Sequence, residues 1–207
     1  MEKIVLGLAP TRRSIFSAPD AVKYADLTRE KLREMGVSFV DITDIAEDGL
    51  LHEDGDRIRI AEKFSRAGVD GLFFPHGNFG TEYEVARLAQ DLNVPVLLWG
   101  PRDERPDENG IRLRDSQCGL FATGKVLRRL RIPFTYLCNC RLEDPEFERG
   151  IRNFLAVCNV VKAFRAVLPC DACFAGQLEA AGPGSVPAEQ RALCGRPVHG
   201  AGRSGLF

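Results

Sequence analysis

The residues best suited to chemistry lie in a polar, glycine-punctuated loop that follows a short apolar run. The loop covers residues 76–82 and reads HGNFGTE. Its imidazole, amide and carboxylate groups can donate and accept hydrogen bonds, and its two glycines allow a ligand to approach the backbone closely. We therefore interpret this loop as part of a ligand-binding site. Its candidate contacts are His76, Gly77, Asn78, Phe79 and Glu82.

A helix is expected to begin directly after this loop. Thr81 and Glu84 have the S/T-x-x-E spacing of a capping box. The free N–H groups of a first helical turn attract a hydroxyl group or an anion. The alternative is a strand-to-helix turn that needs only glycine and a cap, with His76 exposed to solvent. We favour ligand binding, because loops at strand ends gather at the ligand-binding edge of parallel sheets.

Two further strand ends carry candidate residues. Arg12 and Arg13 follow the first apolar run, where a guanidinium group can form paired hydrogen bonds with ligand oxygens. The alternative for them is a solvated basic pair. Trp99, the single tryptophan, ends the fourth apolar run. Its indole is a candidate platform for a sugar ring, and anchoring in the core is the alternative. The segment 7–10, GLAP, lacks the later glycines of a dinucleotide-binding fingerprint.

The seven cysteines are scattered and do not form the pattern of a disulfide framework. Near the C-terminus one C-x-x-C pair is followed by another cysteine and a histidine, a set that can bind zinc, with a redox-active pair as the alternative. The zinc ligands would be Cys170, Cys173, Cys194 and His199. We assign no catalytic residue to the chain, because Cys118 has no evident base near it in the sequence.

Five short apolar runs alternate with segments whose apolar residues recur at helical spacing. The expected strands cover residues 4–9, 37–42, 72–74, 94–99 and 132–137. Asp54-Gly55 is expected to form a tight turn. Asp115 or Ser116 is the expected cap of the fourth helix, and Asp144-Pro145 marks the start of the fifth. This rhythm predicts an α/β fold, because parallel strands are joined by long crossovers that are usually helices.

The expected architecture is a doubly wound, mainly parallel five-stranded sheet. A flavodoxin-like strand order is favoured, and the order 3-2-1-4-5 is the alternative. This α/β domain is expected to cover residues 1–165. Residues 166–207 contain no long apolar run and no clean period, so they are predicted to be an irregular tail that is divergent or disordered.

The composition excludes several classes of protein. The 207-residue chain has a net charge of -1 and is 44% hydrophobic, which is typical of a globular protein and gives no sign of a nucleic-acid partner. No apolar run approaches the about 20 residues of a membrane helix. A strand-like segment follows the first three residues directly and leaves no room for a signal peptide. We therefore expect a cytoplasmic protein without nucleic-acid or membrane partners.

Four motifs, in this order, resemble the N-terminal region of the L-fucose isomerase and L-arabinose isomerase superfamily, in particular its fucose isomerase-like members. They are GLAPTRR at 7–13, PHGNFGTE at 75–82, PVLLWG at 95–100 and RDSQCGL at 114–120. The resemblance implies an oligomeric, cytosolic isomerase that interconverts an aldose and a ketose, usually with Mn²⁺.

In this family the metal-binding domains follow later in the chain. The N-terminal domain helps to build the sugar pocket, often that of a neighbouring subunit. The resemblance therefore implies that Arg12 or Arg13 and the loop 76–82 contact sugar hydroxyls. One departure is Gly77, where fucose isomerases carry a tryptophan, and it leaves the identity of the sugar open.

The length of the chain is a second departure, because family members continue into metal-binding domains after the segment that ends at Arg165. The remaining residues suggest a frameshifted end, a truncated gene product or a divergent tail. We expect the N-terminal substrate-binding and oligomerisation domain of a sugar ketol isomerase, inactive alone and without a cofactor of its own. A non-catalytic sugar-binding module and a zinc-stabilised regulatory protein are the alternatives. The expected partners are a sugar and, in the full-length form, further copies of the protein.

Overall fold

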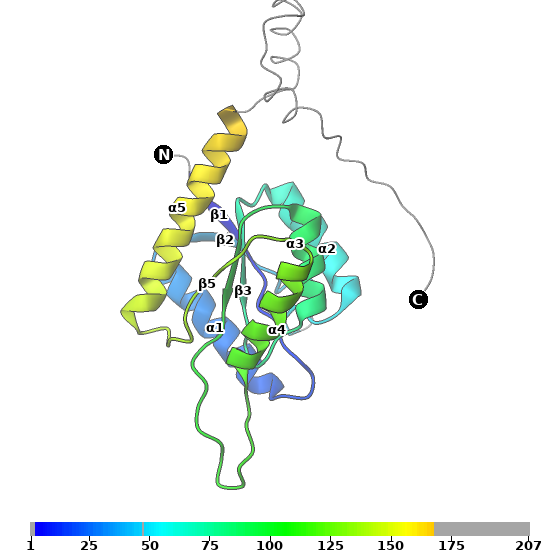
Figure 1. Cartoon of the computed structure of the whole chain (residues 1–207), viewed down its shortest axis with the longest axis vertical. Helices are drawn as coiled ribbons and strands as arrows, with labels where there is room; N and C mark the ends of the chain where they lie inside the picture. The colour runs from blue at the N-terminus through cyan, green and yellow to red at the C-terminus, as the bar shows by residue number, and fades with distance from the viewer. Residues whose placement is uncertain (1–2, 47, 168–207) are drawn as a thin grey trace, which may run out of the picture. The chain divides into compact units, whose positions relative to one another are not determined.

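The computed structural model describes residues 3–46 and 48–167, in which five strands and five helices alternate (Figure 1). The strands are β1 (Val5–Leu8), β2 (Ser38–Val40), β3 (Gly71–Pro75), β4 (Val96–Trp99) and β5 (Thr135–Tyr136). The helices are α1 (Ala18–Glu34), α2 (Asp54–Ala67), α3 (Glu82–Leu92), α4 (Ser116–Arg129) and α5 (Pro145–Val167). The predicted alternation is confirmed.

The strands form one sheet in the order β2-β1-β3-β4-β5, and every neighbouring pair is parallel. In the register of the sheet, Gly7 lies opposite Val40 on one side and Leu72 on the other. This is the flavodoxin-like order, so the favoured topology is confirmed and the order 3-2-1-4-5 is not observed. The winding reverses between β1 and β3, whose following loops are therefore expected to shape a ligand crevice.

Both faces of the sheet are covered by helices, because successive side chains of a strand point to opposite faces. Leu72 and Phe74 pack with α2, α3 and α4 on one face, where Phe64 of α2 is fully buried. Phe73 packs on the other face with α1 and α5, and Phe154 belongs to that second cluster. A strand buried on both sides reads as a continuous apolar run, which explains why residues 72–74 show no alternation in the sequence.

Two local expectations differ from the structure. Asp54-Gly55 forms no isolated turn but opens α2, where Asp54 and Asp56 supply the negative charge that a helix N-terminus favours. The fifth strand is shorter than residues 132–137. The chain turns out of α4 at Arg131, which has a φ of 58°, and the N–H of Ile132 still donates to Leu127 of that helix.

Helix α3 begins where the capping-box spacing places it, but the cap differs from the expected one. Thr81 occupies the N-cap position without a side-chain bond to the helix backbone. Its hydroxyl instead donates to the Glu84 carboxylate, and its backbone N–H donates to the Thr11 hydroxyl at 3.0 Å. The start of α3 is therefore tied to the loop after β1.

The chain divides by its contacts into two units, Met1–Ala163 and Phe164–Phe207, and the sheet belongs to the first. The sequence-based boundary between residues 165 and 166 stays a prediction, because residues 168–207 lie outside those that the structure describes. Within the described residues, no helix has both the length and the apolar character that a membrane crossing requires.

The packing of β3 against α5 generates a test. A Cβ atom added to Gly71 would lie 2.5 Å from the Cys158 Sγ and 3.2 Å from the Phe154 ring. We expect Gly71→Ala to lower the free energy of unfolding by about 1–3 kcal/mol, because a filled core must shift to admit the methyl group. Urea denaturation measures this.

Gly55→Ala is the matched control, because a Cβ at Gly55 has open space around it and alanine favours a helix. Its unfolding free energy should stay level or rise. Equal free energies for both alanine variants would contradict the proposed packing.

Candidate functional site

The loops that follow β1, β3 and β4 meet at the carboxyl edge of the sheet. Thr11 stands at their centre: its backbone N–H donates to Pro75 at 2.8 Å, and its carbonyl accepts from Gly77 at 3.0 Å. The N–H of His76 in turn donates to the Trp99 carbonyl at 2.8 Å. The segments that sequence analysis selected therefore do share one edge.

Asn78 is the residue that locks these loops together. Its side chain is fully buried. Its Oδ1 accepts from the backbone N–H groups of Arg13 at 2.9 Å and Phe79 at 2.6 Å, and its Nδ2 donates to the carbonyls of Arg13 and Ser17, both at 3.1 Å. Its own carbonyl accepts from Asp115 at 2.9 Å. Because both ends of the amide are occupied, Asn78 organises the edge and has no free donor for a ligand.

The His76 side chain lies in the protein interior rather than in a pocket. The imidazole is fully buried, with Nδ1 at 3.0 Å from the Phe74 carbonyl and Nε2 at 2.9 Å from the Thr123 hydroxyl. A carbonyl only accepts, so Nδ1 carries the proton and Nε2 accepts from Thr123. Burial lowers the pKa of His76 from 6.5 to about 4, against the opposing effect of its backbone hydrogen bonds. The ring is therefore neutral at neutral pH, and the alternative of an exposed histidine is wrong.

The two arginines after β1 point to different partners. Arg12 forms an ion pair with Asp48, Nε to Oδ2 2.5 Å, and its Nη2 lies 2.9 Å from the His52 ring. Arg13 pairs with Glu82 at the start of α3. Arg12, Arg13 and His76 therefore do not line one shared hollow, because the arginines are held by different ion pairs and the imidazole is buried.

Arg13, Phe79 and Glu82 nevertheless form one half-exposed cluster. The Arg13 guanidinium lies 4.6 Å from the centre of the Phe79 ring, and Phe79 stacks on Phe16 with 5.5 Å between ring centres. The side chains of Arg13 and Glu82 keep about a third of their surface exposed, at 33% and 30%. These three candidate residues can therefore be reached from solvent.

Trp99 and Gly77 serve packing. The Trp99 side chain is fully buried, with its ring centre 4.7 Å from Phe147 and 6.4 Å from Phe73. It has no face open to a sugar ring, and the alternative of a core anchor fits this position. A Cβ at Gly77 would lie 2.9 Å from the Ala21 backbone of α1. A larger side chain at this position would collide with α1 in the observed arrangement.

Arg114 is a buried charge that sequence analysis did not select. Its Nε and Nη2 donate to the Glu104 carboxylate at 3.0 and 2.8 Å. The other donors reach the carbonyls of Gly77 at 3.4 Å and Arg102 at 2.7 Å. The guanidinium also lies 3.9 Å from the Tyr24 ring. A buried charge with this many partners is a scaffold element that joins α1 to the loops after β3 and β4.

The N-terminus of α4 is capped from outside its own segment. Asp115 holds the N-cap position without a side-chain bond to the helix, and Asp103 accepts from the N–H groups of Ser116 at 3.0 Å and Gln117 at 3.4 Å. Cys118 sits in the first turn and hydrogen-bonds to Asp115, and this bond, with some burial, raises the pKa of its thiol. A thiol that stays protonated is a weak nucleophile.

A polar hollow of about 750 Å³ opens beside this helix start, on the carboxyl side of β4 and β5. Its lining combines guanidinium, carboxylate and amide groups with one exposed phenyl ring. The lining residues are Arg102, Asp103, Glu104, Arg112, Asp115, Gln117, Cys118, Phe121 and Asn139. We call this space the edge hollow.

Several groups in the edge hollow keep hydrogen-bonding capacity. Asn139 uses Nδ2 on the carbonyls of Gly100 and Pro101, at 2.9 and 3.2 Å, and its Oδ1 accepts from no described residue. Arg112 and Gln117 are exposed, and neither side chain bonds to another side chain in the described part of the chain. Sequence analysis missed these residues, although Asn139 follows the fifth predicted strand and Gln117 lies in a quoted motif.

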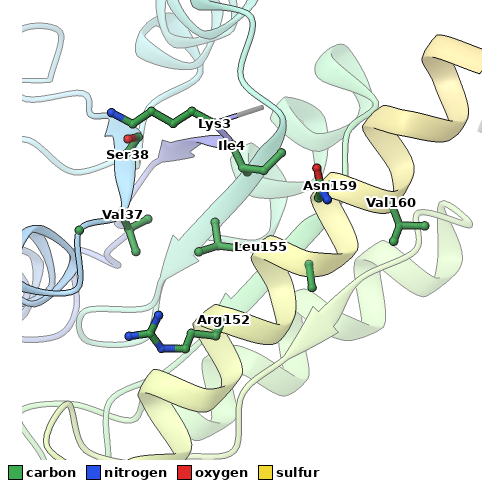
Figure 2. Close-up of a pocket in the computed structure, with 10 residues that line it drawn as sticks. Lys3, Ile4, Val37, Ser38, Arg152, Leu155, Asn159 and Val160 are labelled. Carbon is green, nitrogen blue, oxygen red and sulfur yellow. The ribbon is translucent and has the colours of Figure 1, made fainter. Parts of the chain in front are cut away.

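A second hollow of about 470 Å³ lies at the opposite edge of the sheet (Figure 2). Ile4, Val37 and Leu155 line it, and Lys3 and Arg152 stand at its rim. Ile4 and Val37 directly precede β1 and β2, so this hollow is at the amino edge. Open α/β sheets bind ligands at the carboxyl edge, and we therefore take the edge hollow as the candidate site.

No group of three histidine, cysteine or acidic side chains within residues 3–46 and 48–167 is placed to hold a metal ion. Three acidic residues line the edge hollow: Glu104 accepts from Arg114, Asp103 accepts from the N-terminus of α4, and Asp115 is hydrogen-bonded to Cys118. The candidate zinc residues Cys170, Cys173, Cys194 and His199 all lie outside the described residues.

Comparison with protein families gives a match that covers most of the chain. Residues 7–165 match a family model described as the N-terminal domain of fucose/sulfoquinovose isomerase. No curated protein matches the chain.

Two solved structures share a distant likeness. A solute-binding protein of an ABC transporter from Bacillus halodurans C-125, determined with bound myo-inositol, is 11% identical with a TM-score of 0.32. A galactofuranose-binding protein is 12% identical with a TM-score of 0.28. The matched regions cover 75% and 66% of this chain but only 63% and 57% of those proteins. At these scores neither likeness supports a functional argument.

The Asn78 network predicts a large effect of removing one amide. Asn78→Ala removes the acceptor of the Arg13 and Phe79 N–H groups, and each lost partner in a buried site costs about 1–3 kcal/mol unless water replaces it. The carbonyls of Arg13 and Ser17 lose one donor each but keep the N–H groups of Phe16 and Ala21. We expect a loss of about 3 kcal/mol or more in unfolding free energy, measured by urea denaturation. Asn153→Ala on the exposed side of α5 is the control and should be nearly neutral. Similar values for both variants would refute the locking role.

The buried imidazole predicts a pH dependence of stability. Between pH 6.5 and about 4 the unfolded chain takes up a proton at His76 while the native chain does not, so the native state loses stability as the pH falls through this window. The full loss is about 3 kcal/mol, from roughly 1.4 kcal/mol per pKa unit. The unfolding free energies of wild type and His76→Gln should therefore converge from pH 7 to pH 5. Parallel curves would contradict a neutral buried ring.

Proposed function

The chain belongs to the fucose/sulfoquinovose isomerase family, whose N-terminal domain it matches over residues 7–165, and from this premise we propose that it binds the sugar for an aldose–ketose isomerase of the L-fucose/L-arabinose type. In this proposal the chain supplies one wall of the sugar pocket and a surface for oligomerisation. The single observation that carries the proposal is the family match. The geometry of the carboxyl edge supports it.

The edge hollow has the chemistry that a sugar requires. A sugar hydroxyl both donates and accepts, so it is best bound by groups of both kinds. Arg112 offers donors, Asp115 and the Asn139 Oδ1 offer acceptors, and Gln117 offers both. The Phe121 ring supplies an apolar surface against which the C–H face of a sugar can pack. A volume of about 750 Å³ leaves room for a sugar and for groups from a second protein surface.

The cluster of Arg13, Phe79 and Glu82 is proposed as a second contact surface for the sugar or for the protein surface that covers it. Its groups are half-exposed, and Arg13 can exchange its pairing with Glu82 for a ligand oxygen. The buried candidates act indirectly, by holding the loops in place. Asn78 and His76 hold the loops in which the exposed residues lie, and Arg12 braces the β1 loop against Asp48.

The proposal assigns the metal-dependent chemistry elsewhere. Family members are expected to use Mn²⁺, which polarises the carbonyl and hydroxyl groups of the open-chain sugar. The described residues do not fit such an ion, since their acidic groups near the edge hollow are paired or separated. We therefore derive no isomerisation step from these residues. The chain positions the sugar, and another domain or chain is proposed to supply the metal and move the proton.

We further propose that the protein acts in the cytoplasm, that its full-length form is a homo-oligomer, and that neither nucleic acid nor membrane is a partner. A sugar-binding module without any enzyme partner is the second candidate, and it is favoured by the same hollow and the same lack of a metal-binding group in the described residues. Mixing the chain with metal-binding domains of the family separates these two candidates. Aldose–ketose conversion in the mixture is expected only if the chain is an isomerase domain.

The proposed sugar contacts are testable by calorimetry on the full chain with L-fucose and sulfoquinovose as probes. We expect one of them to bind, and we expect Arg112→Ala and Gln117→Ala each to weaken that binding by about tenfold, the effect of a lost 1.4 kcal/mol. Both side chains are exposed and without side-chain partners among the described residues, so their removal should leave the fold intact.

Arg66→Ala on α2 is the matched control, because its side chain is 80% exposed and lies outside the edge hollow. It should leave the affinity unchanged. Absence of binding by both sugars, or equal binding by all variants, would refute the assignment of the edge hollow.

The purified chain is expected to show no aldose–ketose conversion when Mn²⁺ is added, because the described residues offer no metal site. A coupled assay for the ketose measures this. Metal-dependent turnover by this chain alone would show that the catalytic centre is present and would overturn the division of roles.

A further inference from the structure

A long segment between β4 and α4 stands out from the body of the domain. We call residues 102–113 the arm, and Figure 1 shows it extending beyond the sheet as a narrow loop. Its tip is built by Asp107, whose Oδ1 accepts from the N–H groups of Asn109 at 2.9 Å and Ile111 at 2.8 Å. Backbone bonds from Asp107 to Ile111 and from Gly110 to Asp107, both 3.0 Å, close the turn. The arm therefore has a defined tip.

The tip carries both negative charge and apolar surface. Asp107 and Glu108 are exposed and form no ion pair within the described residues. Ile111 is 58% exposed, and Leu113 at the end of the arm is 52% exposed. The buried Arg114, bonded to the Arg102 carbonyl and the Glu104 carboxylate, fixes the base of the arm. The ordered, projecting tip therefore presents an exposed isoleucine next to two negative charges, and both are available to another surface.

A groove that matches this tip lies on the same domain, between α4 and the edge strand β5. We call it the α4–β5 groove; its volume is about 570 Å³, and most of its surface is apolar. Leu120, Phe134 and Leu137 line it, and the side chains of Phe121 and Tyr136 are 67% and 66% exposed. Because β5 is the last strand of the sheet, no further strand of the described chain covers this side.

The rim of the groove has the charge opposite to that of the tip. Helix α4 contains no acidic residue, and Lys125 and Arg128 line the groove. Neither forms an ion pair with a residue in the described part of the chain. The next helical residue, Arg129, and Arg131 just beyond the helix add to the same positive end.

We propose that the α4–β5 groove binds the arm of a second copy of this chain. Ile111 then lies against the apolar floor of the groove, and Asp107 and Glu108 lie beside Lys125 and Arg128. The contact is intermolecular because the arm leaves the domain at the start of α4. Lys125 lies nine residues after Ser116, roughly 13 Å further along the helix at 1.5 Å per residue, so a domain's own tip would have to fold back over its edge hollow.

Charge complementarity selects this occupant over an arbitrary apolar partner, because opposite charges around an apolar centre fix the register of a contact. The contact joins two different surfaces, so each copy offers one arm and one groove. The groove shares Gln117, Phe121 and Asn139 with the edge hollow, so the bound arm of a second copy would lie at one wall of the edge hollow. The inference does not depend on the identity of the sugar.

Sedimentation velocity on the full chain over a wide concentration range tests this contact. Wild type is expected to associate. A groove variant, Lys125→Glu with Arg128→Glu, should weaken association by about tenfold or more. An arm variant, Asp107→Asn with Glu108→Lys, should do the same, and asparagine at 107 keeps the oxygen that builds the tip. Arg66→Glu, a reversal on exposed α2, should have no effect.

Mixing the groove variant with the arm variant is the decisive measurement, because the unchanged arm of the first can bind the unchanged groove of the second, and Lys at position 108 complements the new glutamates of the groove. Association should return in the mixture, and unfolding by urea should show that both variants are as stable as wild type. A wild type that stays monomeric, association that neither reversal weakens, or a mixture that does not recover association would each overturn the proposal.

Discussion

The buried amide of Asn78 is the interaction on which the carboxyl edge depends. One side chain holds the backbone after β1 at Arg13 and Ser17, while its own carbonyl holds the start of α4 at Asp115. Three loops from three strands are thereby fixed in one geometry. Arg114 also joins these loops, because it donates to the carbonyls of Gly77 and Arg102 and to the carboxylate of Glu104. The exposed groups of the edge hollow and the arm stand on this scaffold, so their positions follow from buried polar bonds rather than from apolar packing.

Sequence reasoning predicted the fold well because the fold depends on patterns that extend over many residues. Five apolar runs separated by helical periods require parallel strands, and few right-handed topologies satisfy them. The details that failed depend on single residues. Asp54-Gly55 resembles a turn but opens α2. The glycine in the left-handed conformation is Gly68, which ends that helix.

The candidate site was predicted as a place but not as a set of side chains. The loops after β1, β3 and β4 do meet, yet His76, Asn78 and Trp99 are buried and Arg12 is paired. A polar residue in a strand-end loop can either contact a ligand or hydrogen-bond to other parts of the protein. The local sequence is the same in both cases. Only the long-range partners distinguish them, such as Thr123 for His76. Arg112 and Asn139 were missed for the converse reason, since their importance arises from segments that approach each other only in the folded chain.

The central claim is that a sugar binds at the edge hollow of this domain. The most direct measurement is a titration of the isotope-labelled chain with L-fucose or sulfoquinovose, followed by amide NMR shifts. The account predicts saturable shifts at residues 102, 112, 115, 117 and 139, with little change around Lys3, Val37 and Arg152 at the opposite edge. Shifts centred on the amino-edge hollow, or none with either sugar, would contradict the account.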